Sequence, residues 1–79
     1  MQPDLSVRRY VGLKQSTEAV EEGLVKKAYI ALDADEHVRL PFEALCREKN
    51  VPIEFAETKA KLGKSCGINV PAAVAVELI

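Results

Sequence analysis

Aromatic residues, histidine and paired cysteines are scarce in this sequence, and each scarcity excludes a class of function. Tyrosine and phenylalanine occur twice each among the 79 residues and tryptophan is missing, so we expect no sheet that stacks RNA bases on several rings. His37 is the only histidine, and Cys46 and Cys66 do not form a CxxC pair. Because this set cannot supply the ligands of a zinc site, we expect neither a metal nor a cofactor, and we expect His37 to be a surface residue.

Motifs for catalysis are also missing or have simpler explanations. The sequence has no glycine-rich phosphate loop between a strand and a helix. Asp33 and Asp35 follow an apolar run, where they suit either helix caps or an acid/base pair. Cys46 and Cys66 are expected to be reduced, buried packing residues, although a small thiol enzyme that uses Cys66 remains an alternative. We expect no catalytic residue, and the protein is predicted not to be an enzyme.

Positive and negative charges nearly balance, but they are unevenly distributed along the chain. The net charge is −1, and residues 33–57 carry seven acids against three bases. One basic face is compatible with this pattern, whereas broad affinity for phosphates is not. No apolar run is long enough to span a membrane and no secretory signal is visible, so we expect a cytoplasmic protein without a membrane partner.

Alternating strand and helix patterns predict a single α/β domain over residues 1–79, with helices on both faces of a sheet. Proline, glycine and polar caps set the expected boundaries. Pro41 in particular predicts that a short helix ends at Leu40 and that a new one begins. The expected order is a strand ending at Gly12, a helix from 14 to 23, a strand over 28–32, helices over 36–40 and 41–50, a strand over 51–55, a helix over 59–66 capped by Thr58, and a strand over 72–78.

One strand-to-helix junction, "VGLKQST", carries side chains that could read nucleic acid. The first amides of a helix have no intrahelical partner and can donate to an acceptor. Lys14 and Gln15 stand at this point, and their side chains suit the edges of bases. A solvated helix start explains the same residues equally well.

Four stretches of the chain resemble a known family. They are "GLKQSTEAVEEG", "DAD", "LPFEALCREKNVPIEF" and "KLGKSCGINVPAA", and together they cover the chain from about Val11 to Leu78. The sequence resembles the kink-turn RNA-binding ribosomal proteins, which include archaeal ribosomal protein L7Ae and small bacterial homologues. The resemblance implies a three-layer α/β/α sandwich around a central, mostly four-stranded mixed sheet.

The resemblance also implies a function and a set of contacts. The protein is expected to bind a kink-turn-like helix–bulge–helix RNA, either ribosomal or regulatory. Its size and charge suit a monomer. The helix start would read sheared G·A pairs, and the apolar loop after "LGKSCG" would hold a nucleotide flipped from the bulge. Lys27 and Lys61 are expected to add phosphate contacts beside those of other lysines. The implied RNA-binding residues are Gly12, Leu13, Lys14, Gln15, Glu18, Lys26, Lys64, Ile68, Asn69, Val70 and Pro71.

Glu18 departs from the family pattern, which usually has a lysine at this position. A carboxylate there would repel phosphates, but it could accept from the amino or imino group of a base. Pro71 also replaces the small residue that is common in the family. The alternative function is therefore a structural or protein-interaction paralogue in which RNA binding is weakened or lost.

Overall fold

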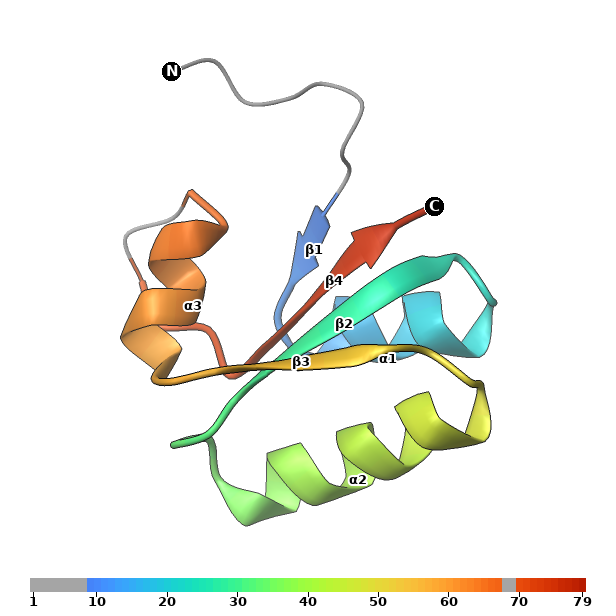
Figure 1. Ribbon diagram of the computed structural model, residues 1–79, viewed down its shortest axis with the longest axis horizontal. Helices are drawn as coiled ribbons and strands as arrows, with labels where there is room; N and C mark the ends of the chain where they lie inside the picture. Colours follow the sequence, from blue (N-terminus) through green and yellow to red (C-terminus); the bar gives the residue numbers. More distant parts are fainter. Residues whose placement is uncertain (1–8, 68–69) are drawn as a thin grey trace.

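The fold was analysed in a computed structural model that describes residues 9–67 and 70–79. Strands and helices alternate along this part of the chain, as predicted (Figure 1). None of the helices in these ranges is long and apolar enough to cross a membrane. The elements are β1 (Arg9–Val11), α1 (Leu13–Glu21), β2 (Val25–Ala31), α2 (Glu36–Glu48), β3 (Ile53–Ala56), α3 (Lys59–Ser65) and β4 (Val74–Leu78).

The strands form one mixed sheet in the order β1-β4-β2-β3. β2 and β3 are parallel, whereas β4 is antiparallel to both of its neighbours. The last strand of the chain therefore lies inside the sheet, and its residues Val74, Ala75 and Val76 are fully buried. This arrangement confirms the expected four-stranded mixed sheet.

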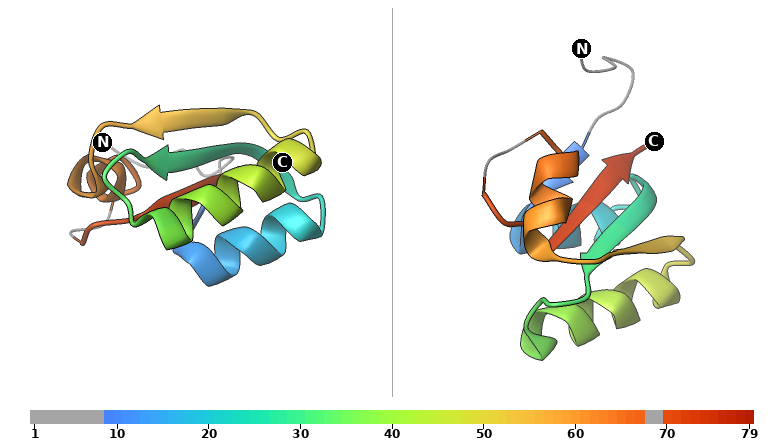
Figure 2. Two further views of the ribbon diagram at one scale, coloured as in Figure 1. Left: turned by 90° about the horizontal axis from the view of Figure 1, so that it is seen from below. Right: turned by 60° about the vertical axis from the view of Figure 1, so that its left-hand side comes forward.

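The helices cover both faces of the sheet, which confirms the three-layer prediction (Figure 2). α1 and α2 pack on one face over the main cluster of aliphatic residues, where Phe42 is the only buried aromatic side chain in the described part of the chain. α3 packs on the other face through Leu62, over a smaller cluster that is built mainly from alanines. Small aliphatic residues thus fill both layers, in keeping with the low aromatic content.

Pro41 does not divide two helices, so that prediction was wrong. It lies inside the continuous helix α2, on its exposed side. Proline removes one backbone hydrogen bond from a helix. The helix nevertheless continues because Phe42 and Cys46, on its inner side, are buried in the main cluster.

The start of α1 and the end of β2 also differ from the prediction. α1 begins at Leu13, and Ser16 lies fully buried at the end of its first turn. β2 begins at Val25 and ends at Ala31, so Leu32 lies outside the buried strand and is exposed. Local pattern alone could not locate either boundary, because the start of α1 is fixed by the Gly12–Val74 hydrogen bond and the end of β2 by its pairing with β3 and β4.

Both cysteines are free thiols. Cys46 is fully buried in the main cluster, and Cys66 packs partly buried against the smaller one, in agreement with the expected packing roles. Burial raises the pKa of the Cys46 thiol to about 11, and the nearby Glu43 carboxylate adds to this effect. Cys46 is thus held in its unreactive, protonated form.

The two aspartates after β2 have separate structural roles. Asp35 Oδ1 accepts from the His37 amide at 2.7 Å and caps α2. Asp33 Oδ1 accepts from the Lys59 amide at 2.7 Å, at the first residue of α3. Thr58 Oγ1 accepts from the Lys61 amide at 3.0 Å and completes the start of α3, as predicted. The capping interpretation of Asp33 and Asp35 is therefore the one that the structure supports.

Replacing the α2 cap gives a test of this arrangement. Asp35→Ala removes the acceptor of the His37 amide, and we expect it to lower the free energy of unfolding by about 1 kcal/mol in urea titrations. Asp35→Asn keeps a side-chain oxygen at the same place and should retain most of the stability. Equal losses in both variants would contradict the capping role.

Candidate nucleic-acid interface

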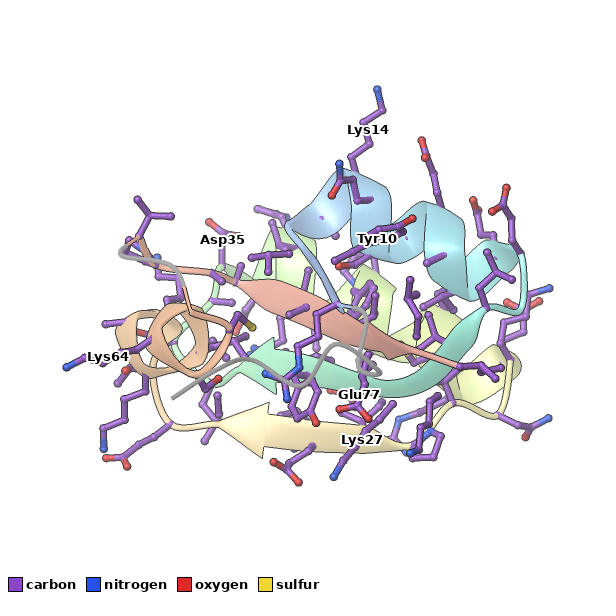
Figure 3. The ribbon with its side chains drawn as sticks, turned by 90° about the horizontal axis from the view of Figure 1, so that it is seen from above. Tyr10, Lys14, Lys27, Asp35, Lys64 and Glu77 are labelled. Carbon is purple, nitrogen blue, oxygen red and sulfur yellow. The ribbon has the colours of Figure 1, made fainter. Side chains whose placement is uncertain are left out.

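Three loops meet at one end of the sheet. The directions of the strands bring together the β1–α1 junction, the β2–α2 loop and the segment that enters β4 (Figure 3). The Gly12 amide donates to the Val74 carbonyl at 3.0 Å, and the Ala31 amide donates to the Ala73 carbonyl at 2.9 Å. These two hydrogen bonds hold the segment before β4 between the start of α1 and the end of β2.

The N-terminus of α1 is polar and has no side-chain cap. Gly12 occupies the N-cap position with φ 105°, a conformation that glycine adopts without strain, and it has no side chain that could accept from the first turn. The side chains of Leu13, Lys14 and Gln15 are exposed at this point. Since α2 and α3 have side-chain caps, the start of α1 alone among these helices leaves its first amides open to an external acceptor.

An apolar segment leads into β4 at the same end of the sheet as this helix tip. The side chain of Val70 is 60% exposed, and Pro71 is also exposed. The next residue is fixed, because the Ala72 amide donates to the Lys59 carbonyl at 3.0 Å. Ile68 and Asn69, which the resemblance places in the same loop, lie outside the described residues.

Gly63 allows this segment to lie directly on α3. A Cβ atom at Gly63 would collide with the Val70 carbonyl oxygen and would lie 3.1 Å from the Val70 carbonyl carbon. The backbone of α3 is therefore in close contact with the backbone of the segment, which no larger residue would permit. The sequence pattern predicts a helix at Gly63 but gives no reason for a glycine within it.

Leu32 is a site residue that the sequence analysis missed. It follows β2 at the same end of the sheet and is 55% exposed, and Leu13 is 41% exposed on α1. Together with Val70, these residues place exposed aliphatic side chains on each of the three loops. The sequence does contain one sign that Leu32 is exposed. Leu32 stands directly before the capping residues Asp33 and Asp35, where a strand must already have ended.

The lysines fall into two groups. Lys14 and Lys64 project away from the body of the protein, from α1 and α3 respectively, and neither forms an ion pair with a described residue (Figure 3). Lys26 lies near the start of β2, at the opposite end of the sheet from the loops, where its Nζ is 3.8 Å from Glu77. The structure therefore does not bring Lys26 together with the other predicted contacts.

Lys27 and Lys61 are also paired with acids. Lys27 Nζ donates to Glu54 at 2.7 Å, and this bond raises the pKa of Lys27. Lys61 Nζ donates to Glu57 at 2.8 Å, and the ammonium lowers the pKa of that carboxyl. Both pairs are solvent-exposed, so they hold these lysines only weakly.

Glu18 lies one turn into α1 from the helix tip and is exposed. It forms no ion pair within the described part of the chain. Its carboxylate thus adds negative charge beside Lys14 and Gln15, close to the open amides of the first turn. Because of this negative charge, we do not expect the tip of α1 to attract phosphates in general.

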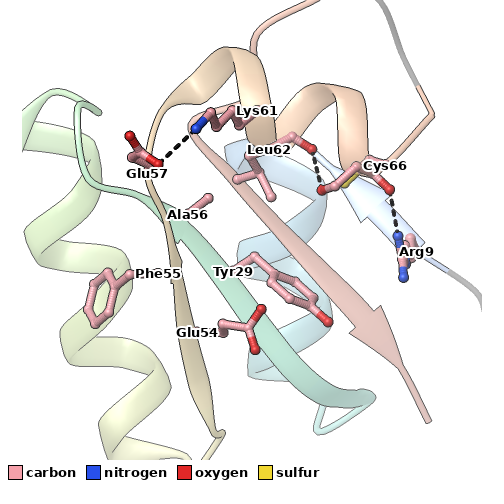
Figure 4. Close-up of a pocket in the computed structure, with 10 residues that line it drawn as sticks. Arg9, Tyr29, Glu54, Phe55, Ala56, Glu57, Lys61, Leu62 and Cys66 are labelled. Atoms are coloured by element: carbon pink, nitrogen blue, oxygen red, sulfur yellow. Dashed lines mark hydrogen bonds and ion pairs between the residues drawn. The ribbon is translucent and has the colours of Figure 1, made fainter.

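A cavity of about 570 Å³ lies beside α3, on the face of the sheet that α3 covers (Figure 4). Its polar groups mostly satisfy one another. Arg9 Nη1 donates to the Ser65 carbonyl at 2.9 Å, and Lys61 pairs with Glu57. Tyr29 donates to Glu77 at 3.2 Å, and its pKa is raised by burial and by that carboxylate. This cavity offers fewer open donors and acceptors than the end of the sheet.

Comparison with known proteins gives this geometry a context. Residues 7–78 match the model of the ribosomal protein L7Ae/L30e/S12e/Gadd45 family. The chain belongs to this family. The match covers every strand and helix described above, including the α1 tip and the segment before β4.

Several relatives of similar length are named as RNA-binding proteins. A protein from Caldanaerobacter subterraneus subsp. tengcongensis is 43% identical over 72 residues, which cover 91% of this chain and 88% of that protein. A protein from Halalkalibacterium halodurans is 41% identical over 63 residues, covering 80% of this chain and 77% of the other.

Solved structures show the same fold. A Giardia lamblia 15.5 kD RNA-binding protein superposes with a TM-score of 0.82 at 30% identity. The aligned region covers 90% of this chain but only 60% of the Giardia protein, so this family member spans less than two thirds of it. A Bacillus halodurans protein of unknown function has a TM-score of 0.81 at 21% identity, covers 90% of this chain and 71% of the other, and supports the fold alone.

The close contact at Gly63 can be tested by adding one methyl group. Gly63→Ala should displace the segment around Val70 and lower the free energy of unfolding by about 1–3 kcal/mol, although alanine is the better helix former. The displacement is measured as amide chemical-shift changes at Val70 and Ala72. Lys64→Ala, at the next and exposed position, is the matched control and should leave these shifts and the stability nearly unchanged. A stabilised Gly63→Ala protein with unchanged shifts would show that the contact is not tight.

Proposed function

We propose that this protein is a non-catalytic RNA-binding protein that recognises kink-turn-like helix–bulge–helix RNA. The observation that carries the proposal is that one end of the sheet holds both the uncapped, polar tip of α1, which is bonded through Gly12 to Val74, and the exposed apolar segment at Val70 and Pro71 that leads into β4. Relatives named as RNA-binding proteins, over most of their length, support the general class. We further propose that it acts as a cytoplasmic monomer on ribosomal or regulatory RNA.

The helix tip would recognise the paired part of the RNA. Lys14 can donate to guanine O6 and N7, and Gln15 can donate and accept at the same time. The free amides of the first turn add donors for a phosphate or a base acceptor. Gly12 would permit close approach of the RNA, because it has no side chain at this corner.

The apolar segment would receive an unstacked nucleotide. Val70 and Pro71 present hydrophobic surface at the same end of the sheet as the tip, and Ile68 and Asn69 of the same loop are proposed to complete the contact. The segment is held in place by the hydrogen bonds of Ala72 and Ala73 and by the close contact with Gly63. Little ordering would therefore be required on binding, and this preserves affinity.

Recognition by shape also fits the charge of the protein. Three lysines, Lys26, Lys27 and Lys61, are paired with acids, and the net charge is −1. A bent RNA with a splayed nucleotide can be recognised by fit and base contacts, with fewer phosphate contacts than a regular duplex would need. We therefore propose that Lys14 and Lys64 supply the main electrostatic contribution.

A binding titration at fixed salt tests this function. The wild-type protein should bind a kink-turn RNA more tightly than a plain duplex of equal length, as measured by fluorescence anisotropy. Lys14→Ala and Gln15→Ala should each weaken kink-turn binding about tenfold, because each removes contacts to a base edge. Lys49→Ala is the control, since it removes the same charge beyond the end of α2, which lies at the opposite end of the sheet.

Equal affinity for the kink-turn and the duplex would reject this function. Glu18 then becomes informative, because it replaces the usual lysine of the family with an acid beside the tip. That result would favour the alternative of a structural or protein-interaction paralogue.

A further inference from the structure

A second, smaller cavity lies on the flank of α1, between this helix and the edge strand β1. Its volume is about 250 Å³, and Tyr10 of β1 lies alongside the helix (Figure 3). The helix contributes a stripe of residues spaced by three and four positions, which therefore share one side. The lining residues are Tyr10, Gln15, Glu18, Ala19, Glu22 and Leu24.

The cavity combines apolar walls with a polar rim. Ala19 is almost fully buried and forms the floor, while Leu24 and the ring of Tyr10, which is 42% exposed, give apolar surface at the sides. An exposed aromatic ring beside a shallow cavity can stack on a planar group. Flat, partly apolar ligands with polar edges match this arrangement better than compact ions do.

The rim of the cavity consists of two carboxylates, which only accept hydrogen bonds, and one amide, which can both donate and accept. Glu18 and Glu22 provide carboxylates, and neither forms an ion pair with a lysine, arginine or histidine among residues 9–67 and 70–79. Gln15 provides an amide that can donate as well as accept. Two carboxylates repel a phosphate, so this cavity favours a base of an RNA strand over its phosphates.

We infer that this cavity selects an unpaired guanine in the bound RNA. Guanine presents two donors, N1–H and N2–H₂, next to the acceptor O6 along one edge. A Glu18 or Glu22 carboxylate can accept from the two donors while the Gln15 amide donates to O6. The inference rests on the proposed function and extends it, because it assigns Glu18 a role in base selection.

An arginine side chain of a protein partner is the rival ligand. Its guanidinium also stacks on tyrosine and donates to carboxylates. It has no acceptor, however, so it makes no use of the Gln15 amide donors, which stay hydrated. Gln15 also lies at the helix tip that faces the RNA in the proposed function, so a base on the same RNA can reach the cavity without a second partner.

The test uses a set of kink-turn RNAs that differ only at the unpaired positions of the bulge. Each position carries guanine, adenine, cytosine, uracil or inosine in turn, and affinities are measured by anisotropy for the full chain. The wild type should prefer guanine at one position by about tenfold over adenine, which lacks the N1–H donor. Inosine lacks the N2 amino group and should fall between the two.

Matched variants separate selection from general charge. Glu18→Gln exchanges the carboxylate for an amide and should remove most of the guanine preference. Glu21→Gln makes the same change on α1 outside the cavity, and it should keep the preference. Lys14→Ala should weaken all the RNAs by the same factor and leave the preference intact.

The outcomes distinguish this inference from the proposed function. Tight binding of every RNA with no preference for guanine would overturn the inference and leave the proposed function standing. An equal effect of Glu18→Gln and Glu21→Gln would also overturn it, as a general charge effect. Binding of all kink-turn RNAs no tighter than a duplex would reject both. A Tyr10 amide shift produced by a short arginine peptide, but not by RNA, would assign the cavity to a protein partner instead.

Discussion

The hydrogen bond from the Gly12 amide to the Val74 carbonyl is the interaction on which the candidate interface depends. β4 lies inside the sheet, with a strand on each side, so its first residue is a rigid reference point. The bond attaches the start of α1 to that point, and the Ala31–Ala73 bond attaches the end of β2 beside it. Segments far apart in the sequence are thereby held as one surface without aromatic packing.

The two faces and the end of the sheet differ in how their polar groups are satisfied. On the face that carries α3, Arg9, Tyr29, Lys27 and their acidic partners bond mostly to one another. At the loop end, the amides of the α1 tip are open, and the nearby Leu32 and Val70 side chains are exposed. A surface with unused donors beside exposed aliphatic groups is suited to binding a ligand, whereas a self-paired polar face is suited to solvent.

Local signals in the sequence were sufficient for much of the fold. Thr58 and Asp35 cap helices as their residue types indicate, and Gly67 takes a positive φ after α3. Pro41 was misleading because its effect on the helix depends on the burial of Phe42, which local sequence does not show. Leu32 was missed for a similar reason, since the end of β2 is determined by its pairing with β3 and β4.

The candidate site depended on topology rather than on local pattern. Lys14 and Gln15 could be recognised as the start of a helix, but only the strand order places them at the same end of the sheet as Val70 and places Lys26 at the other end. The family resemblance supplied this grouping before the structure did, and the close approach at Gly63 was visible only in three dimensions. The spacing of residues along the chain shows neither the grouping of the site residues nor the close approach at Gly63.

The most direct test of the central claim is a map of amide chemical shifts and exchange rates with and without a kink-turn RNA. The account predicts that the largest changes fall at Leu13, Lys14 and Gln15 and at Val70 and Ala72, as one contiguous group. Changes concentrated at Lys27, Tyr29 and Glu77, on the self-paired face of the sheet, would contradict it.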